Sequence, residues 1–416
     1  MALARSSFRP AVRAAAAAAA AILLCSAAVI ARPLLEDGDR MVFLGDSITA
    51  QRIHTRYVMN YFALRYPDTL LTFRNSGWSG ERAPGGLARL DRDVLSVKPD
   101  VVSICYGMND GGVTHFDRKL YANFMDGMTG LVDRLKGAGA RVVLLPPGVV
   151  DPDRKNWNAP ERMAIYNPTL ARFSDGVILL AKRENLPYYD LNRLMTDVQK
   201  RAKADDPAFT MIPDGVHPSA PGQALMAYAM LKALGCDEQA SGLTIDAATG
   251  KTEADRCRVS GLKIGKDEIS FTRTDAALPT YFDPEAEVIF RYCPIPEELN
   301  RYMFRVSGLS GGSWTLTVEG IETGAFTSGE LAAGVSLSGL PGPWKTLGEE
   351  VNRLTKEQEA LFNTRWRDVF LKIPPEGSAE MQAQIADLDR QIAEREKARA
   401  RAVRDRTWKW KLTRQP

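Results

Sequence analysis

Short apolar runs alternate with longer amphipathic segments in the first half of the chain, and this alternation limits the possible folds more than any other feature. Helix-like stretches lie near 54–65, 118–136, 160–185, 192–204 and 220–234. The apolar runs between them are MVFL at 41–44, LLTF at 70–73, VVSIC at 101–105, RVVLL at 141–145 and YYDL at 188–191. Buried strands separated by helices predict a mostly parallel sheet covered on both faces. We therefore expect an α/β domain over 40–235.

The sequence changes in character after Gly235. Its apolar segments now mix β-branched and aromatic residues with Gly, Pro and Asp, as in LTIDAATG, EISFTRT, EVIFRYC, YMFRVSGL and SWTLTVEG. This composition favours strands joined by tight turns. We expect a smaller, antiparallel, β-rich unit over 243–340.

The last part of the chain is predicted to be helical. A helical pattern extends from 341 to 370, and two prolines then interrupt it. A charged stretch follows from 378 to about 406, with apolar residues spaced four, three and four apart at Met381, Ile385, Leu388 and Ile392. That spacing gives one apolar stripe on a helix. We expect 341–416 to be a helical, charged C-terminal segment.

The N-terminus has the pattern of an export signal. Three arginines (Arg5, Arg9 and Arg13) precede an alanine-rich apolar run from Ala14 to Ala31, and no acidic residue occurs among them. A positive region, an apolar region and small residues in this order are typical of a secretory signal peptide. We expect 1–31 to be a signal peptide of a periplasmic or extracellular protein. The alternative is an uncleaved membrane anchor, because an apolar run of this length barely spans a bilayer.

Charge gives no support to nucleic acid as a partner. The chain has 54 basic and 51 acidic side chains, and three of the basic ones lie in the leader, which leaves 51 of each. Nucleic-acid binding requires clustered positive charge. Balanced charge outside the leader fits a protein with other partners.

Four cysteines lie outside the leader. Their spacings do not resemble a zinc site, and no metal is expected. Cysteines of an exported protein can form disulfides. Cys236 and Cys257 flank the junction between the two predicted units and are the expected pair, while Cys105 and Cys293 are left without an assigned partner.

GDSIT at 45–49 follows the first predicted strand directly. Ligands of open α/β sheets bind beyond the carboxyl ends of the strands, so Ser47 is expected in an exposed crevice. A serine hydroxyl needs an adjacent base to act as a nucleophile. His217, one of three histidines, lies in PDGVHPSAPG with Asp214 three residues before it. Because such an aspartate can orient the imidazole, we expect Ser47, His217 and Asp214 to form a catalytic triad.

Two further loops offer donors for the oxyanion of an acyl-transfer reaction. NSGWSG at 75–80 ends in Gly80, whose backbone N–H no Cβ obstructs, and YGMND at 106–110 carries the side-chain amide of Asn109. The backbone N–H of Ser47 is the third donor. One such donor stabilises a transition state by roughly 3–4 kcal/mol.

Together these blocks resemble the SGNH (GDSL) hydrolase family. In chain order they are GDSI with Ser47, NSGWSG with Gly80, GMND with Gly107 and Asn109, and DGVH with Asp214 and His217. The resemblance covers about 40–235 and implies a flavodoxin-like α/β/α sandwich that hydrolyses ester or thioester bonds. It implies nothing about 243–416. No organic cofactor is implied either, since the triad supplies both nucleophile and base.

Other residues near these blocks have structural interpretations. We expect Asp46 to hydrogen-bond its own turn, Asp110 to support its loop, and His54 and His115 to lie at the surface or the rim of the site. Trp78 is open to two interpretations, stacking on a sugar ring or packing. GLSGG at 308–312 matches the G-x-S-x-G pattern of α/β-hydrolases, but no histidine follows it, so it is interpreted as a glycine-rich loop.

The expected function is that of an exported carbohydrate O-acetylesterase, acting on a small-molecule or polysaccharide ester. A lipase, lysophospholipase or thioesterase of the same family is one alternative. A non-catalytic envelope-binding module is another, with the β-rich unit and the basic tail as its working parts. Membrane contact through the leader, or through Trp408 and Trp410 of the tail, is left open beside a solvated helix.

Overall fold

The structure is a computed structural model that describes residues 33–154, 158–374 and 376–416. The leader predicted at 1–31 lies outside the described residues and stays a prediction. Within the described ranges, no helix combines the length and the hydrophobicity needed to cross a bilayer.

Four parallel strands form the first sheet, three of them at the predicted apolar runs, while the run predicted at 70–73 corresponds to a strand at 72–77 that extends into the predicted loop. They are β1 (Arg40–Gly45), β2 (Thr72–Gly77), β3 (Val101–Cys105) and β4 (Arg141–Leu145), in the order β2-β1-β3-β4. The run at 188–191 forms only one parallel bridge, from Tyr188 to Leu144. Pro187 directly before it has no N–H to donate to a ladder. The bridge lies where a flavodoxin-like sheet of order 2-1-3-4-5 has its fifth strand.

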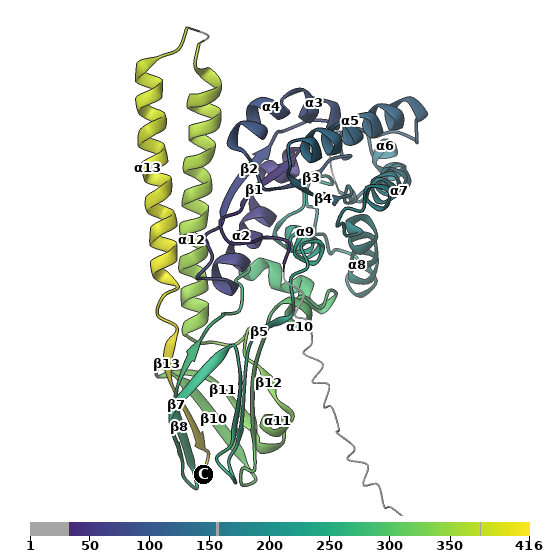
Figure 1. Cartoon of the computed structure of the whole chain (residues 1–416). Coiled ribbons are helices and arrows are strands. Elements are labelled where there is room, and N and C mark those ends of the chain that lie inside the picture. The colour runs from purple at the N-terminus through teal and green to yellow at the C-terminus, as the bar shows by residue number, and fades with distance from the viewer. Residues whose placement is uncertain (1–32, 155–157, 375) are drawn as a thin grey trace, which may run out of the picture. The chain divides into compact units, whose positions relative to one another are not determined.

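Helices cover both faces of this sheet (Figure 1). Alternate residues of β1 point to opposite faces, so that Phe43 packs in one core and Val42 in another. The first core includes α2 (Ile53–Arg65), α8 (Leu191–Asp205) and α9 (Ala220–Ala233), and the second includes α5 (Arg118–Gly137) and α7 (Tyr166–Glu184). Shorter helices are α1 (Ser47–Ala50), α3 (Ala83–Ala88), α4 (Leu90–Asp93), η1 (Leu95–Val97) and α6 (Pro160–Ala164). The expected α/β/α sandwich is confirmed.

Two packed sheets follow in the second half of the chain. One has the order β11-β10-β13-β8-β7 and the other β12-β9-β5-β6. Neighbouring strands are antiparallel except β5 and β9, which pair in parallel. The strands are β5 (Gln239–Asp246), β6 (Thr252–Asp255), β7 (Cys257–Ile264), β8 (Glu268–Asp275), β9 (Arg301–Ser307), β10 (Ser313–Val318), β11 (Ile321–Thr327), β12 (Val335–Ser336) and β13 (Thr407–Arg414).

The segment EVIFRYC is not a strand. It lies mostly in the 3-10 helix η2 (Pro284–Arg291), followed by α10 (Ile295–Leu299), and a further short helix, α11 (Ser328–Ala333), joins β11 to β12. Pro284 begins η2, and Ala286 and Ile289, three residues apart, are buried in the first core. Spacing by three is that of a 3-10 turn, and this burial outweighs the strand-like composition.

The end of the chain corrects the prediction of a wholly helical tail. Residues 407–414 form β13, which lies between β10 and β8. Trp408, Trp410 and Leu412 alternate with exposed residues and are buried. The Trp410 ring stacks on Phe271 with 5.7 Å between centroids and on Trp344 with 6.0 Å. Both tail tryptophans are therefore core residues and are not exposed to a membrane, and 407–414 is not part of a solvated helix. Membrane contact through the leader stays a prediction.

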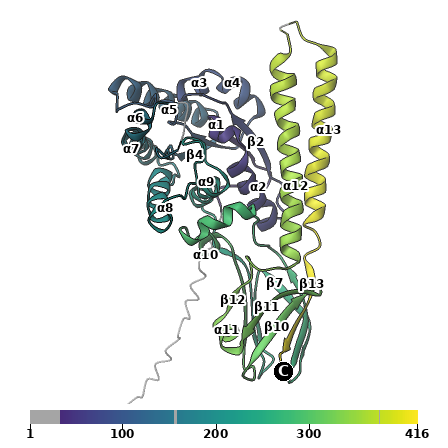
Figure 2. The same cartoon turned by 180° about the vertical axis from the view of Figure 1, so that it is seen from behind.

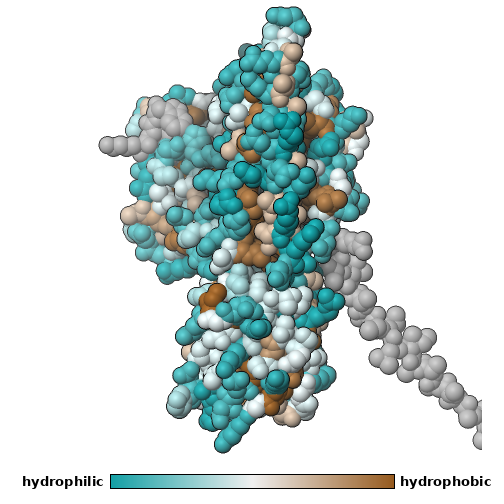
Figure 3. Space-filling model, turned by 90° about the vertical axis from the view of Figure 1, so that its left-hand side faces the viewer, coloured by the Kyte–Doolittle hydropathy of each residue, from teal (hydrophilic) through white to brown (hydrophobic). Residues whose placement is uncertain are grey.

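A helical hairpin precedes β13. It consists of α12 (Pro343–Asn363), the π-helical turn η3 (Thr364–Val369), η4 (Phe370–Lys372) and α13 (Ala379–Ala402). Figures 1 and 2 show α12 and α13 side by side, with α12 next to α2. The predicted stripe of α13 is partly realised, because Ile385 and Ile392 are buried. The face over the hairpin is largely hydrophilic, with scattered hydrophobic patches (Figure 3).

No disulfide joins the four described cysteines, which are all free thiols. Cys236 is buried in the first core, whereas Cys257 packs against the core of the two β sheets. The expected pairing is therefore wrong in this structure, because the two side chains belong to different hydrophobic clusters.

The position of Trp410 leads to a stability prediction. Trp410→Ala should lower the free energy of unfolding by about 3–5 kcal/mol, because it empties the centre of a packed core. Lys409→Ala on the exposed side of the same strand should change it by less than about 0.5 kcal/mol. Urea denaturation measures both. Similar losses for the two variants would contradict the central position of β13.

A buried carboxyl in the hairpin leads to a pH prediction. Burial raises the pKa of Glu359 to about 7, although the hydrogen bond from Thr55 and the charges of Arg56, Arg52 and Arg399 oppose the shift. The folded state binds the Glu359 proton more tightly than the unfolded state does. The resulting contribution to stability is complete below the pKa of this carboxyl in the unfolded chain and is lost as the pH rises through about 7. Glu359→Gln should therefore gain stability relative to the unchanged protein between pH 5 and 8, by up to about 3 kcal/mol. A pH-independent difference between the two would contradict the shift.

Candidate active site

Ser47 follows the carboxyl end of β1. Asp46 caps the short helix α1, and its Oδ1 accepts a hydrogen bond of 2.9 Å from the backbone N–H of Ile48. A Cβ on Gly45 would lie 2.7 Å from the carbonyl oxygen of Cys105, so only glycine fits before this turn. The expected role of Asp46 in its own turn is confirmed.

The loop before α9 carries the predicted base. Asp214 Oδ1 accepts hydrogen bonds from the backbone N–H groups of Val216 at 2.9 Å and His217 at 2.7 Å. Gly215 makes the turn between them with a φ of +84°. Its carbonyl accepts a 2.9 Å hydrogen bond from the backbone N–H of Asp151, which ties this loop to the segment after β4.

The three residues predicted as a triad lie together. The Nδ1 atom of His217 is 2.8 Å from Oδ2 of Asp214, and its Nε2 atom is 2.9 Å from Oγ of Ser47. Burial opposes ionisation of Asp214, but the hydrogen bonds from the His217 and Val216 amides outweigh it and lower the pKa of this carboxyl. A carboxylate is thus held on one nitrogen of the imidazole and a hydroxyl on the other, which is the geometry of a general base acting on a nucleophile.

The predicted oxyanion donors start from the same edge of the sheet. In the register of the sheet, Gly45 lies opposite both Gly77 of β2 and Cys105 of β3. The loops with Gly80 and Asn109 follow those two strands. Gly80 has a φ of +73°, a backbone conformation that favours glycine.

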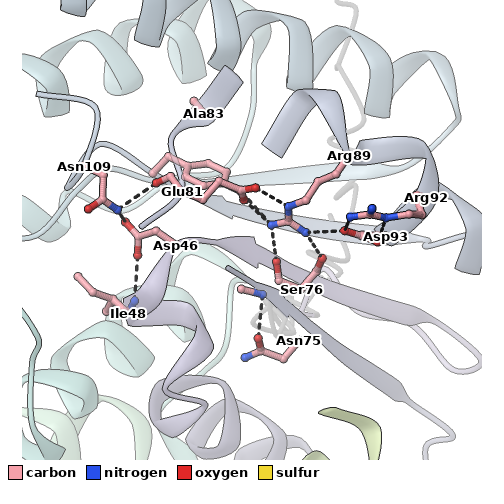
Figure 4. Close-up of polar contacts among 12 residues, drawn as sticks. Asp46, Ile48, Asn75, Ser76, Glu81, Ala83, Arg89, Arg92, Asp93 and Asn109 are labelled. Carbon is pink, nitrogen blue, oxygen red and sulfur yellow. Dashed lines mark hydrogen bonds and ion pairs between the residues drawn. The ribbon is translucent and has the colours of Figure 1, made fainter. Parts of the chain in front are cut away.

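Asn109 approaches both the turn that carries Ser47 and the loop that carries Gly80, which we call the glycine loop. Its side-chain Nδ2 donates to the carbonyl of Glu81 at 3.0 Å and, over a longer 3.4 Å, to Oδ2 of Asp46 (Figure 4). Among the described residues, none accepts a hydrogen bond from the backbone N–H of Ser47 or Gly80. The backbone N–H groups of Ser47 and Gly80 are therefore available to an incoming oxygen. The Asn109 amide can exchange its weak 3.4 Å contact with Asp46 for a hydrogen bond to that oxygen.

Two buried carboxyls support these loops. Asp110 accepts hydrogen bonds from the backbone N–H groups of Ala83 at 2.8 Å and Gly107 at 3.0 Å, which confirms its expected structural role. Burial raises the pKa of Asp46 to about 7 and that of Asp110 to about 6. The hydrogen bonds of Asp46 and Asp110 connect the three loops beside Ser47.

An ion-pair network behind Gly80 was missed by the sequence analysis. Arg89 donates from Nε and Nη2 to the carboxylate of Glu81, at 2.7 and 2.5 Å, and from Nη1 to Oγ of Ser76 at 2.8 Å (Figure 4). The hydroxyl of Tyr106 donates to the same carboxylate at 2.6 Å. An isolated ion pair has no sequence motif. The one signal of this network in the sequence is the position of Glu81 directly after Gly80.

The remaining candidates lie as follows. Trp78 packs, because the guanidinium carbon of Arg367 lies 3.5 Å from the centroid of its ring. His115 is exposed, as expected. His54 is buried, which corrects the expectation of a surface or rim position: its Nδ1 lies 2.7 Å from Oε1 of Gln223, and burial lowers its pKa to about 4. GLSGG lies in the loop between β9 and β10, as expected.

No group of three or more His, Cys, Asp and Glu side chains in the described part of the chain is arranged to hold a metal ion.

The α/β part of the chain, which carries these residues, is similar in sequence to known proteins. Residues 43–225 match the model of the GDSL-like Lipase/Acylhydrolase family. An acetylxylan esterase of Geobacillus stearothermophilus is 25% identical over 219 residues, which are 48% of this chain and 94% of that protein. An isoamyl acetate-hydrolyzing esterase of Saccharomyces cerevisiae is 23% identical over 212 residues, which are 48% of this chain and 87% of that protein.

One solved structure resembles nearly the whole chain. A gut microbial diltiazem-metabolizing enzyme superposes with a TM-score of 0.78 at 21% identity, over 92% of this chain and 98% of that one. This likeness shows a shared fold that extends over the β sheets and the hairpin. The family match and the two esterase relatives concern the α/β part. Residues 43–225 are therefore similar to a GDSL-like lipase/acylhydrolase domain, and this similarity supports a carboxylic ester hydrolase activity for that part of the chain.

Proposed function

We propose that the chain is an exported serine esterase that removes acetyl groups from carbohydrates through an acyl-enzyme on Ser47. The observation that carries this proposal is the alignment of Ser47 Oγ, His217 Nε2, His217 Nδ1 and Asp214 Oδ2, with separations of 2.9 and 2.8 Å. Each of the two contacts lies within the range for proton transfer or orientation in general base catalysis.

The reaction proceeds in two steps. Ser47 Oγ attacks the ester carbonyl carbon while its proton passes to His217 Nε2, and the oxygen that becomes negative accepts hydrogen bonds from the Ser47 and Gly80 amides and from Asn109. The tetrahedral intermediate collapses, and the imidazolium gives its proton to the departing alcohol. Water then attacks the acetyl-serine, His217 takes one proton from this water and returns it to Ser47 Oγ, and acetate leaves.

Three observations support the acetyl ester of an exposed carbohydrate as substrate. Both curated relatives bear names that specify acetate esters, one of them on a polysaccharide. The leader pattern at 1–31 favours export, where polysaccharides are found. The His217 side chain keeps a quarter of its surface exposed, which leaves the triad accessible from solvent.

Substitution of the nucleophile tests the reaction. Ser47→Ala should lower kcat for p-nitrophenyl acetate by at least about 10⁴-fold, because the remaining site has no nucleophile. It should also abolish labelling by a fluorophosphonate. Ser96→Ala on an exposed segment is the matched control and should behave as the unchanged protein. Equal activity of the Ser47 variant would place the chemistry elsewhere, whereas no hydrolysis and no labelling in any of the three proteins would favour a binding module.

A substrate panel tests the acyl group and the alcohol. The unchanged protein should hydrolyse p-nitrophenyl acetate faster than the butyrate and the octanoate, and should release acetate from at least one of acetylated xylan, pectin and alginate. Kinetics and acetate assays measure these rates, with the Ser47 variant as the blank. A preference for octanoate would favour a lipase, lysophospholipase or thioesterase and overturn the carbohydrate assignment.

A further inference from the structure

The glycine loop of the site is contacted from behind by the helical hairpin. Arg367, in the π-helical turn η3, donates from Nη2 to the carbonyl of Gly77 at 2.9 Å. Its guanidinium carbon lies 3.5 Å from the centroid of Trp78 and 4.3 Å from that of Trp366. These two indole rings meet edge to face, with 5.8 Å between centroids. The guanidinium thus contacts both rings and the carbonyl at which β2 ends.

A second connection reaches the other side of Gly80. Trp366 Nε1 donates to Oδ1 of Asp93 at 3.2 Å, and Oδ2 of the same carboxylate accepts from Arg89 Nη1 at 3.3 Å. Arg89 in turn holds the carboxylate of Glu81 (Figure 4). The hairpin is therefore linked both to the residues before Gly80 and, through two ion pairs, to the residue after it.

Gly80 has no side chain that could hold it in place. A Cβ at this position would meet no atom within 4 Å, and its φ of +73° is a conformation that glycine leaves easily. The neighbours on either side must therefore set the direction of its N–H. On these two sides lie Trp78, two residues before Gly80, and Glu81, directly after it, whose backbone N–H donates to the Trp78 carbonyl at 3.2 Å. The carbonyl of Glu81 also accepts the amide of Asn109 at 3.0 Å. Any shift of this segment would move two of the three oxyanion donors.

The charge of Arg367 is not explained by an ion pair. In the described part of the chain, no carboxylate pairs with it. Burial and the nearby Arg89 lower its pKa, so holding this cation here costs free energy. A π-helical turn is itself rare and is frequently found at functional sites. The contacts that Arg367 does make all lead to the glycine loop.

We propose that Arg367 is a positioning residue for the glycine loop, and that the hairpin is thereby a working part of the esterase site. This inference rests on the proposed function. The planar guanidinium can stack on Trp78 and donate to Gly77 at the same time, whereas the ammonium of a lysine is a point charge that cannot stack in this way. Arg367 acts through the loop and does not touch the substrate.

The kinetic test compares three variants. Arg367→Ala should lower kcat for p-nitrophenyl acetate by about ten- to hundredfold through misplaced donors, with KM changed less than about twofold. Arg367→Lys should recover little of this loss. Arg365→Ala is the matched control, because this residue of the same turn pairs with Asp389 at 2.6 Å, across the hairpin, and should leave kcat unchanged. Melting temperatures check that all three variants fold.

A second readout does not depend on activity. Hydrogen exchange followed by mass spectrometry should show faster exchange of the amides in 75–82 for Arg367→Ala and no change for Arg365→Ala. Unchanged exchange and kcat in Arg367→Ala, or full recovery by Arg367→Lys, would overturn the proposal. A loss that is confined to KM for carboxylate-bearing esters would also overturn it and assign Arg367 to substrate charge. If the unchanged protein hydrolyses no ester, the exchange comparison still decides the positioning role while the proposed function fails separately.

Discussion

The common level at which β1, β2 and β3 end is the constraint on which the site depends. Gly45 lies opposite both Gly77 and Cys105, so three loops leave the sheet at one edge. Glycine is required where α1 crosses this edge: a Cβ on Gly77 would lie 2.3 Å from the backbone nitrogen of Ala50. A side chain there would push away the helix that begins at Ser47. The register of the strands thus brings the nucleophile and the oxyanion donors together, and side-chain contacts are not needed for this.

The predicted base, His217, lies on a loop that does not follow directly from a strand of the sheet. A buried charge network holds this loop instead. Asp151 is fully buried and pairs with Lys203 Nζ at 2.5 Å, while Thr210 donates to its other oxygen at 2.7 Å. Its backbone N–H bonds the carbonyl of Gly215 between the two predicted triad partners. Because a buried carboxylate without partners costs several kcal/mol, these bonds fix the segment strongly. The 2.9 Å contact between His217 and Ser47 follows from two supports that are far apart in the sequence.

The parts of this structure that sequence reasoning predicts are those determined by local pattern. Apolar runs mark four strands, and the motif blocks mark Ser47, Asp214 and His217. The errors arise where distant packing decides. EVIFRYC has the composition of a strand but forms η2, because Ala286 and Ile289 bury against the α/β core.

The same reason explains the other differences. The alternation of WKWKL is visible in the sequence, yet its strand partner β8 lies more than a hundred residues earlier in the chain. His54 is a polar residue whose burial depends on Gln223, 169 positions away. Contacts of this kind carry no local signal.

The packing around β2 shows why the accessory hairpin bears on catalysis. Glu359 of α12 accepts a 2.9 Å hydrogen bond from Thr55, whose Oγ1 accepts one of 3.1 Å from Asn75 Nδ2. The same Nδ2 donates to the carbonyl of Thr49 in α1 at 2.8 Å, while Oδ1 of Asn75 accepts the N–H of Gly77. A buried group that loses its partner costs about 1–3 kcal/mol, so removal of the hairpin would disturb the turn that carries the nucleophile. The change of sequence character at Gly235 marks a change in secondary structure, while the packing that shapes the active site continues beyond it.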